Sequence, residues 1–589
     1  MSHRADLATV TNSITGAAPT SRFAVPEWLE GAGALDVFAA IVAFLLPVAI
    51  SPVMGSYTFT PKLAVLLVVA AVGLPQLARR CRARDRAAWA AAAFLAVGLA
   101  SAASSGSVLS GFFGGYLTGT GWVFWCGVVG AWAIGRSTGP RGRELVVAGL
   151  VASAVVNALV AIVQQAFQLA SPVLGLYQGT QADGLMGNPI FLESIELGAL
   201  AVVLVRTCSG RWRWSLLALL LSASLELSGE RFAIALLALL AAWALVVHRD
   251  RFAALFAASL AAGYAVTYGL SSALVHERIA QSVVSNPRPT LWKVLLHAFE
   301  HRPLIGFGPG QTLQASTAFE SAALARRLPV ATYFTDAHDI FVEVAITTGI
   351  LGILAFAAFG LLALRGASGA LLGVAVMAVA VELVEPLNVG VTPIAFLALG
   401  AAGAGTALSG GPSRGRARHA ATAALTLVAL GASAVMLYGD YELNVALLRF
   451  DYPVATAGAR ALAVWADAAL VPAEVATNRS VALADGTHWL RLSRYWHSVA
   501  VSRNPTDTQM WTGLAGADAE LGNLRAATAE YGTALRLDRF ATEALVGLAR
   551  VEAHEGHSTE AVVLLRRALA TAPGYRPAHQ LLAQLGGTR

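Results

Sequence analysis

The segment Asp336-Ala337-His338-Asp339 contains the residue types of a proton-transfer site. A histidine side chain has an ordinary pKa near about 6.5, so it can take a proton from a hydroxyl group at neutral pH. We expect the flanking aspartates to raise the pKa of His338 by stabilising its charged form. The structural alternative is that Asp336 or Asp339 caps the following helix, with His338 as a polar interface residue.

Arg231 and Arg288 are candidate phosphate-binding residues. The planar guanidinium group of arginine donates two parallel hydrogen bonds to phosphate oxygens. The same group stabilises negative charge on a phosphate leaving group, an electrostatic effect worth about a few kcal/mol. Arg288 precedes Trp292 by four residues, and Arg231 ends the turn-like sequence Ser228-Gly229-Glu230-Arg231.

Several glutamates lie within or against apolar segments. An ionisable residue there costs about 2.5–3.5 kcal/mol on insertion scales, so each is a functional hypothesis by default. The structural alternative is mutual ion pairing that fixes helix packing. The glutamates concerned are Glu193, Glu196, Glu226, Glu230, Glu343, Glu382 and Glu385.

Nucleotide, metal and disulfide chemistry are not indicated. The glycine string 306–310 has neither a preceding strand nor a following Gly-Lys-Thr/Ser, so we expect a tight turn beside the membrane. Three cysteines provide no metal or disulfide framework. We therefore predict no metal site, no cofactor and no disulfide.

The composition is that of a membrane protein. Of the 589 residues, 56% are apolar and 13% are charged, whereas a soluble protein carries about a quarter charged residues. Thirteen apolar runs approach the roughly 20 residues that a membrane span needs. They lie near 35–54, 61–78, 87–105, 118–135, 145–168, 189–205, 214–228, 232–247, 253–272, 339–364, 368–386, 392–409 and 420–438.

The distribution of arginine orients these spans. With the N-terminal segment 1–34 in the cytoplasm, arginines gather in the inner loops, whereas outer loops 106–117 and 169–188 contain no Lys or Arg. This assignment explains the net charge of +6 without nucleic-acid binding. It also places the loop 273–338 and residues 439–589 outside. No cleavable signal peptide is indicated.

The C-terminal part has a repeat of 34 residues, in which Leu514 corresponds to Leu548 and Leu582. This period is typical of tetratricopeptide (TPR) helix pairs, which bury their apolar faces by stacking. The fold predicted is therefore all-α: a bundle of about 13 spans over 35–438, with the external loop 273–338 and a helical domain over 439–589. The repeats either bind a protein partner or brace the membrane domain.

The order of motifs resembles the O-antigen ligase and polymerase superfamily. The resemblance covers about residues 35–410. It rests on Arg288-x3-Trp292, the Pro-x-x-Gly-x-Gly sequence at 303–308, the acidic-flanked His338 leading to Glu343, and the Gly-x-x-Gly at 349–352. Further similar motifs are Pro61-Lys62, Gly187-Asn188-Pro189, the Ser228–Arg231 turn and Leu387-Asn388. The family more often has His-Asn where this chain has His338-Asp339.

The resemblance implies a glycosyltransferase of the bacterial cytoplasmic membrane, multi-pass, with its C-terminal domain outside the cytoplasm. Such an enzyme moves a glycan from undecaprenyl pyrophosphate to an acceptor hydroxyl at the outer face, with no cofactor and no metal. It implies catalytic roles for His338, Arg288 and Arg231, and substrate-binding roles for Trp292, Asn188 and Glu343.

Alternatives within the family are a polymerase of O-antigen or exopolysaccharide and a protein O-oligosaccharyltransferase, so the acceptor is a glycan, a lipid or a protein. The alternative from another class is a non-catalytic transporter of a lipid-linked glycan. A transporter is expected to place charged residues deep at the bilayer midplane. In this chain they concentrate toward the outer side, which favours the enzyme.

Overall fold

The computed structural model describes residues 31–116, 118–169, 175–177, 180–269, 286–403, 415–482 and 485–586. Within these ranges the regular secondary structure is helical, apart from one isolated bridge between Tyr177 and Gln181. The predicted all-α fold is confirmed. Most of the expected cytoplasmic segment and the first part of the expected external loop, residues 1–30 and 273–285, lie outside the described residues.

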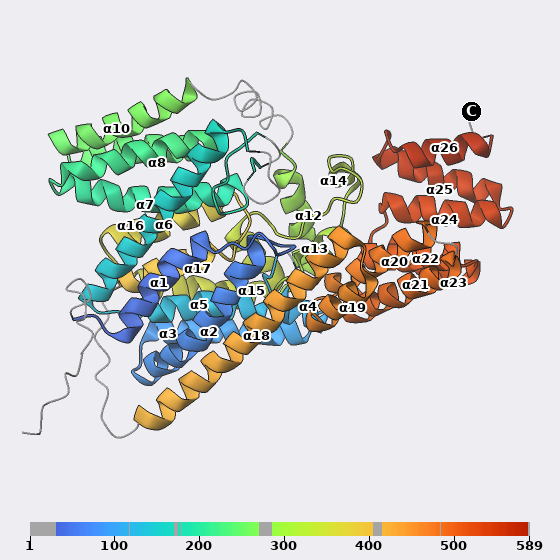
Figure 1. The fold of residues 1–589 in the computed structure, drawn as a ribbon, viewed down its shortest axis with the longest axis horizontal. Coiled ribbons are helices and arrows are strands. Elements are labelled where there is room, and N and C mark those ends of the chain that lie inside the picture. The colour runs from blue at the N-terminus through green and yellow to red at the C-terminus, as the bar shows by residue number, and fades with distance from the viewer. Residues whose placement is uncertain are drawn as a thin grey trace, which may run out of the picture.

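Each of the thirteen apolar runs contains a helix of its own (Figure 1). Five of these helices, α2, α3, α6, α15 and α18, are long and apolar enough to cross a membrane by length and composition, and α1, α9, α16 and α17 are shorter apolar helices. The number of spans therefore stays a prediction. The helices are α1 (Ala34–Val48), α2 (Phe59–Arg82), α3 (Arg86–Ala103), α5 (Trp122–Arg136), α6 (Pro140–Ala166), α7 (Pro189–Cys208), α8 (Ser215–Ser228), α9 (Arg231–Val247), α10 (Arg251–Tyr268), α15 (Ile340–Leu364), α16 (Ala370–Glu382), α17 (Thr392–Ala402) and α18 (Gly415–Arg449).

The break between α8 and α9 occurs at a glycine. Gly229 follows the last residue of α8 and has a φ of 68°, in the left-handed region that glycine adopts without a Cβ clash. Because α9 starts two residues later, Arg231 is its first residue. The two apolar runs are thus separate helices, as the sequence predicts.

Helix α15 is broken at Gly349, which has a φ of 67°. The segment Pro303–Gly308 packs into the break, where the backbone N–H groups of Ile350 and Leu351 donate to Pro303 and Leu304, 2.7 and 3.2 Å away. A Cβ on Gly349 would lie 2.3 Å from the carbonyl carbon of Leu304. The tight turn expected at the glycine string therefore has a specific role, because it completes the hydrogen bonding of a broken helix.

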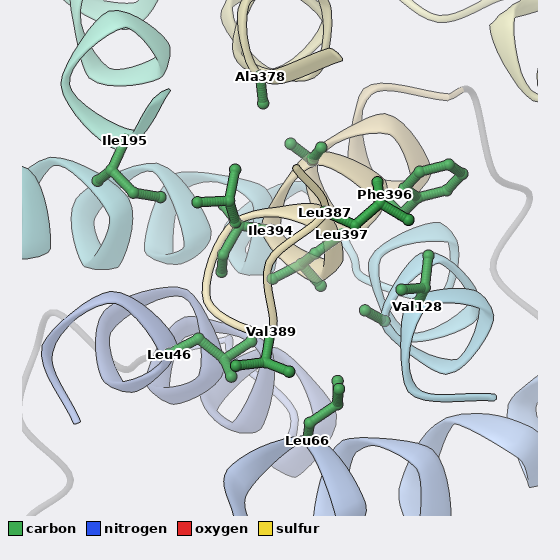
Figure 2. Close-up of a cluster of buried hydrophobic side chains, with 14 of the residues drawn as sticks. Leu46, Leu66, Val128, Ile195, Ala378, Leu387, Val389, Ile394, Phe396 and Leu397 are labelled. Carbon is green, nitrogen blue, oxygen red and sulfur yellow. The ribbon is translucent and has the colours of Figure 1, made fainter. Parts of the chain in front are cut away.

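The loop that follows α16 is anchored in the core of the bundle. Leu387 and Val389 are 6% and 1% exposed. Figure 2 shows Val389 beside Leu46 of α1 and Leu66 of α2. The two polar residues that alternate with these side chains, Glu385 and Asn388, are therefore held in place by the packing of their neighbours.

The described part of the predicted external loop forms a small helical layer beside the bundle, which we call the external layer (Figure 1). It contains α12 (Arg288–His301), α13 (Thr312–Ala318) and α14 (Ala322–Ala325). These helices share a hydrophobic cluster that includes Leu291, Ala315, Leu324 and Ala337. Because Ala337 belongs to this cluster, the residues around His338 are part of the same layer.

The C-terminal helices follow the predicted repeat. The first helix of each repeat starts at Thr508, Thr542 and Arg576, a spacing of 34 residues. The expected boundary at residue 438 lies inside α18, which runs without interruption from the membrane domain toward the repeats (Figure 1). The helices after it are α19 (Tyr452–Ala461), α20 (Leu470–Ala482), α21 (Gly486–Arg503), α22 (Thr508–Glu520), α23 (Leu524–Leu537), α24 (Thr542–His554), α25 (Ser558–Thr571) and α26 (Arg576–Gln584).

Candidate functional site

His338 lies in a short loop that enters α15 and has an unusual backbone conformation. Its φ is +55°, a region that few residues other than glycine adopt. Two buried carboxyl groups hold this loop. Asp336 Oδ1 accepts from the backbone N–H of His338 at 2.6 Å, and Glu343 Oε2 accepts from that of Ala337 at 2.8 Å. Such strain persists only where the surroundings enforce it, and it is frequent at active sites.

The hydrogen bonding of the His338 ring assigns its tautomer. Nδ1 lies 3.2 Å from the backbone carbonyl oxygen of Asp336. A carbonyl oxygen only accepts, so Nδ1 carries the hydrogen and the neutral ring presents Nε2 as a proton acceptor. The ring of Phe334 packs edge-on against the imidazole, with 5.4 Å between centroids. His338 is thus oriented as a base.

The pKa of His338 is lowered to about 4, which is opposite to the sequence-based expectation. Burial is the main cause, and the positive charge of Arg288 adds to it. The prediction was wrong because Asp336 is itself buried. Burial first, and then the neighbouring Glu343, raise the pKa of Asp336 well above its usual value. His338 is therefore neutral at physiological pH, the form that accepts a proton.

Arg288 is the first residue of α12 and forms an ion pair across the site. Its Nη2 donates to Glu385 Oε2 at 2.7 Å, and the side chain keeps 24% of its surface exposed. Trp292 lies one turn further along the same face of α12, and its Nε1 donates to the carbonyl oxygen of Ala337 at 2.9 Å. The Arg-x3-Trp spacing thus brings a phosphate-binding side chain and a loop-fixing side chain to the same place.

Glu343 has a structural role in this geometry. It is 2% exposed, and Oε1 accepts from the hydroxyl of Thr312 at 2.8 Å. With Oε2 occupied by Ala337 N–H, both carboxyl oxygens face protein donors. The structure therefore uses Glu343 to join α13 to the His338 loop.

Asn188 also acts on the backbone, because its Oδ1 accepts from the N–H of Ile190 at 3.0 Å and caps α7. The loop before it is tied to α2 by Lys62, which is 1% exposed and donates to the carbonyl oxygen of Leu185 at 2.8 Å. A Cβ on Gly390 would lie 3.0 Å from the Lys62 side chain. Lys62 therefore joins the loop before α7 to the loop after α16.

Arg231, at the start of α9, is half-buried and makes no hydrogen bond or ion pair with the residues that the structure describes. Its neighbour Glu230 accepts from Gln181 Nε2 at 3.2 Å. The charge of Glu230 also acts on Glu385, the partner of Arg288. The turn that carries Arg231 is therefore close enough for its charge to influence the Arg288–Glu385 pair.

The buried glutamates differ in their partners. Glu385 pairs with Arg288, and Glu382 accepts from Thr392 at 2.6 Å. Glu196 in α7 is fully buried. Glu196 remains without an assigned role.

The structure joins Arg288, Trp292, His338 and Glu343 in one network of contacts, whereas Arg231 begins α9 and Asn188 caps α7. Sequence reasoning named Asp336 as a neighbour of His338 or a helix cap but missed its organising contact, in which Oδ2 accepts from the N–H of Leu387 at 3.3 Å. This bond links the His338 loop to the loop that carries Glu385. The sequence signal was the Leu387-Asn388 motif itself, but its partner lies 51 residues away.

The O-antigen ligase family model matches residues 216–357. This region includes Arg231, Arg288, Trp292, His338 and Glu343, and Asn188 precedes it. No curated protein matches the chain.

Solved structures of TPR proteins are similar at low identity. The TPR domain of Arabidopsis OM64 is 18% identical, covers 20% of this chain and 99% of that chain, and has a TM-score of 0.18. A thermophilic TPR protein of Thermus thermophilus is 20% identical, with coverages of 29% and 91% and a TM-score of 0.23. The APC/C hetero-tetramer Cut9-Hcn1 is 10% identical, with coverages of 81% and 79% and a TM-score of 0.22.

Proposed function

Because residues 216–357 match the O-antigen ligase family, we propose that this chain is a membrane glycosyltransferase. It moves a glycan from undecaprenyl pyrophosphate to an acceptor hydroxyl on the outer face of the bacterial cytoplasmic membrane. In the proposed topology the chain crosses the bilayer thirteen times, with residues 1–34 inside and residues 439–589 outside.

One observation supports the proposal that a transfer reaction takes place at this site. His338 is neutral, presents Nε2, and lies within the electrostatic reach of Arg288. A transfer from a lipid pyrophosphate to a hydroxyl requires a proton acceptor and a group that binds the anion in the same site.

In the proposed reaction, His338 Nε2 takes the proton of the acceptor hydroxyl as its oxygen attacks the anomeric carbon of the glycan. The bond between that carbon and the phosphate oxygen breaks, and undecaprenyl pyrophosphate leaves with the electron pair. The attack and departure on opposite faces invert the anomeric configuration. Arg288 and Arg231 bind the pyrophosphate and stabilise the charge that develops on it.

Glu385 tunes this site by holding Arg288. One guanidinium nitrogen donates to Glu385, and the side chain keeps 24% of its surface exposed, so N–H groups remain for a ligand. The ion pair therefore fixes the orientation of the Arg288 guanidinium group before the lipid-linked glycan binds, which reduces the entropy lost on binding.

The test is transfer by purified protein in liposomes that contain a lipid-linked glycan, normalised to correctly inserted protein. General base catalysis contributes about 10²–10⁴-fold, so we expect His338→Ala to lose transfer while it retains donor binding. His297→Ala is the matched control, since His297 is exposed on α12. Retention of most normalised transfer by His338→Ala would remove this residue from the mechanism.

The products of the same assay separate the related functions. A single addition to a lipid or protein acceptor indicates a ligase or an oligosaccharyltransferase, and a ladder of lengths indicates a polymerase. Movement of the lipid-linked glycan across the bilayer without any new glycosidic bond would contradict the enzyme and indicate the transporter.

A further inference from the structure

The C-terminal helices contact the external layer through polar side chains from three places. Arg326 Nε donates to the carbonyl oxygen of Ala570 at 3.1 Å, and Gln509 Nε2 donates to that of Ala331 at 3.2 Å. Arg539 Nη2 donates to the carbonyl oxygen of Glu320 at 3.4 Å. We call these three hydrogen bonds, together with the contact between the side chains of Glu320 and Asp538, the brace.

The contact between Glu320 and Asp538 joins two buried acids. Their side chains are 7% and 1% exposed, and both line the same small cavity. Asp538 Oδ1 accepts from the N–H of Phe540 at 2.8 Å, and no N–H or O–H of the described residues donates to Oδ2. Two neighbouring carboxyl groups that are both buried do not readily ionise together, so the pair retains one proton.

The charges around the pair act in opposite directions, since the charge of Asp538 raises the pKa of Glu320 and the cation Arg539 lowers it. After burial, the carboxyl groups of Asp538, Glu320, Glu543 and Asp507 raise the pKa of the neighbouring Tyr333. Burial, followed by the charge of Asp538, raises the pKa of Glu320 to about 8.

The external layer transmits the brace to His338. On α13, Ser316 Oγ donates to the carbonyl oxygen of Phe334 at 3.1 Å, and Phe334 packs on the imidazole ring. Four residues earlier on the same helix, the hydroxyl of Thr312 donates to Glu343, which holds the loop. The short helix α13 therefore connects the repeat helices to Phe334 and Glu343, the two residues that support His338 and its loop.

We propose that the repeat region is a positioning element of the transfer site, in which the brace holds α13 and Phe334 so that the strained His338 loop keeps its conformation. The proton shared by Glu320 and Asp538 makes this hold depend on pH. The expected effect on catalysis rests on the proposed function, whereas the brace itself does not. Of the two roles expected for the repeats, these contacts favour bracing of the membrane domain over binding of a protein partner.

The direction of the pH dependence follows from the raised pKa of Glu320. Its protonated form stabilises the brace fully below the ordinary value of 4.5, and this contribution is lost as the pH rises through about 8. Asp507, whose pKa is raised to about 6, chiefly by burial, changes in the same direction. Tyr333 stays protonated throughout, because burial raises its pKa.

A distance measurement tests the brace without reference to catalysis. Nitroxide labels at Ala323→Cys on α14 and Val563→Cys on α25 occupy exposed positions, in a chain whose Cys81, Cys126 and Cys208 are replaced by serine. Pulsed electron paramagnetic resonance on the full chain in nanodiscs is expected to give a narrow distance distribution at pH 5.5 and a broader one at pH 8.5.

Glu320→Gln is the decisive variant in that measurement. Its amide group donates to Asp538 without a titrating proton, so we expect a narrow distribution at both pH values. Equal widths at pH 5.5 and 8.5 in the parent chain, or a pH-dependent width in Glu320→Gln, would overturn the shared proton as the control of the brace.

Kinetics then test the positioning role. In the double variant Arg326→Ala/Gln509→Ala we expect kcat to fall on the order of tenfold, since displacement of a catalytic group by a fraction of an ångström is costly. The KM for the lipid-linked donor should stay unchanged. Arg536→Ala is the control, because the Arg536 side chain bonds only to Thr533 of its own helix.

A normal kcat in the correctly inserted double variant would overturn the positioning role. A parent chain that shows no transfer with any acceptor would contradict the proposed function, and the distance measurement would still decide whether the brace exists.

Discussion

The guanidinium group of Arg288 and the carboxyl group of Glu385 lie 2.7 Å apart, although 97 residues separate them in the sequence. This ion pair connects the external layer to the loop anchored in the core of the bundle. It fixes the arginine whose positive charge lowers the pKa of His338.

Arg288→Lys tests whether the planar guanidinium group, and not only its positive charge, is needed. Lysine retains the positive charge but has no planar pair of donors. Loss of one charge-assisted hydrogen bond costs about 1.5–3 kcal/mol, so we expect kcat/KM to fall roughly ten- to a hundredfold. The measurement is transfer at varied donor concentration with protein abundance verified. Near-normal kinetics in Arg288→Lys and also in Arg231→Lys would leave donor binding by these arginines without support.

The pH profile of transfer reports on His338. Because its pKa is lowered to about 4, we expect kcat/KM to stay high down to pH 5 and to fall only near pH 4. Folding stability changes in the same direction as transfer. Because the pKa of His338 is lowered in the folded state, its contribution to stability is present above about pH 6.5 and is lost as the pH falls through about 4. Half-maximal transfer near pH 6.5 would contradict the burial of the imidazole.

Trp292→Phe distinguishes loop fixing from substrate binding. The change removes the indole N–H that donates to Ala337, a bond worth about 0.5–1.5 kcal/mol net. If Trp292 fixes the loop, kcat falls and the KM for donor and acceptor is unchanged. A rise in KM at constant kcat would instead assign Trp292 to substrate. Trp243→Phe, on the exposed face of α9, is the matched control.

Gly349→Ala should prevent correct assembly of α15. The added Cβ would meet the Leu304 backbone at 2.3 Å, at a φ of +67° that disfavours alanine. Gly360→Ala on the same helix is the control, because a Cβ there has no atom within 4 Å. We expect a large loss of thermal stability in the first variant and little change in the second. Equal melting temperatures would contradict the break in α15.

Cysteine labelling tests the proposed topology. In a chain without native cysteines, Glu560→Cys on the surface of the repeats should react with an impermeant reagent in intact cells. Ala83→Cys, between α2 and α3, should react only after lysis. Labelling of Glu560→Cys only after lysis would refute the thirteen-span arrangement and the outward site.

Features that depend on local sequence were predicted well. Hydropathy located the apolar helices, the spacing of Leu514, Leu548 and Leu582 located the repeats, and Gly229 separated α8 from α9. Contacts between distant segments were not predictable. The bond from Leu387 to Asp336 and the pair formed by Arg288 and Glu385 depend on packing that periodicity does not encode. The predicted rise in the pKa of His338 was wrong for the same reason, since the sequence shows the acidic neighbours of this residue but not its burial.

The break in α15 also bears on how the chain is made. The N–H groups of Ile350 and Leu351 have their acceptors in the Pro303–Gly308 segment, and an unpaired N–H in hydrocarbon costs several kcal/mol. In its broken conformation this span therefore cannot settle in the bilayer without the Pro303–Gly308 segment. The ribosome produces the Pro303–Gly308 segment first, and in the proposed topology that segment is translocated before α15 is released. Biogenesis thus has a required order, in which translocation of one segment precedes the final seating of the next.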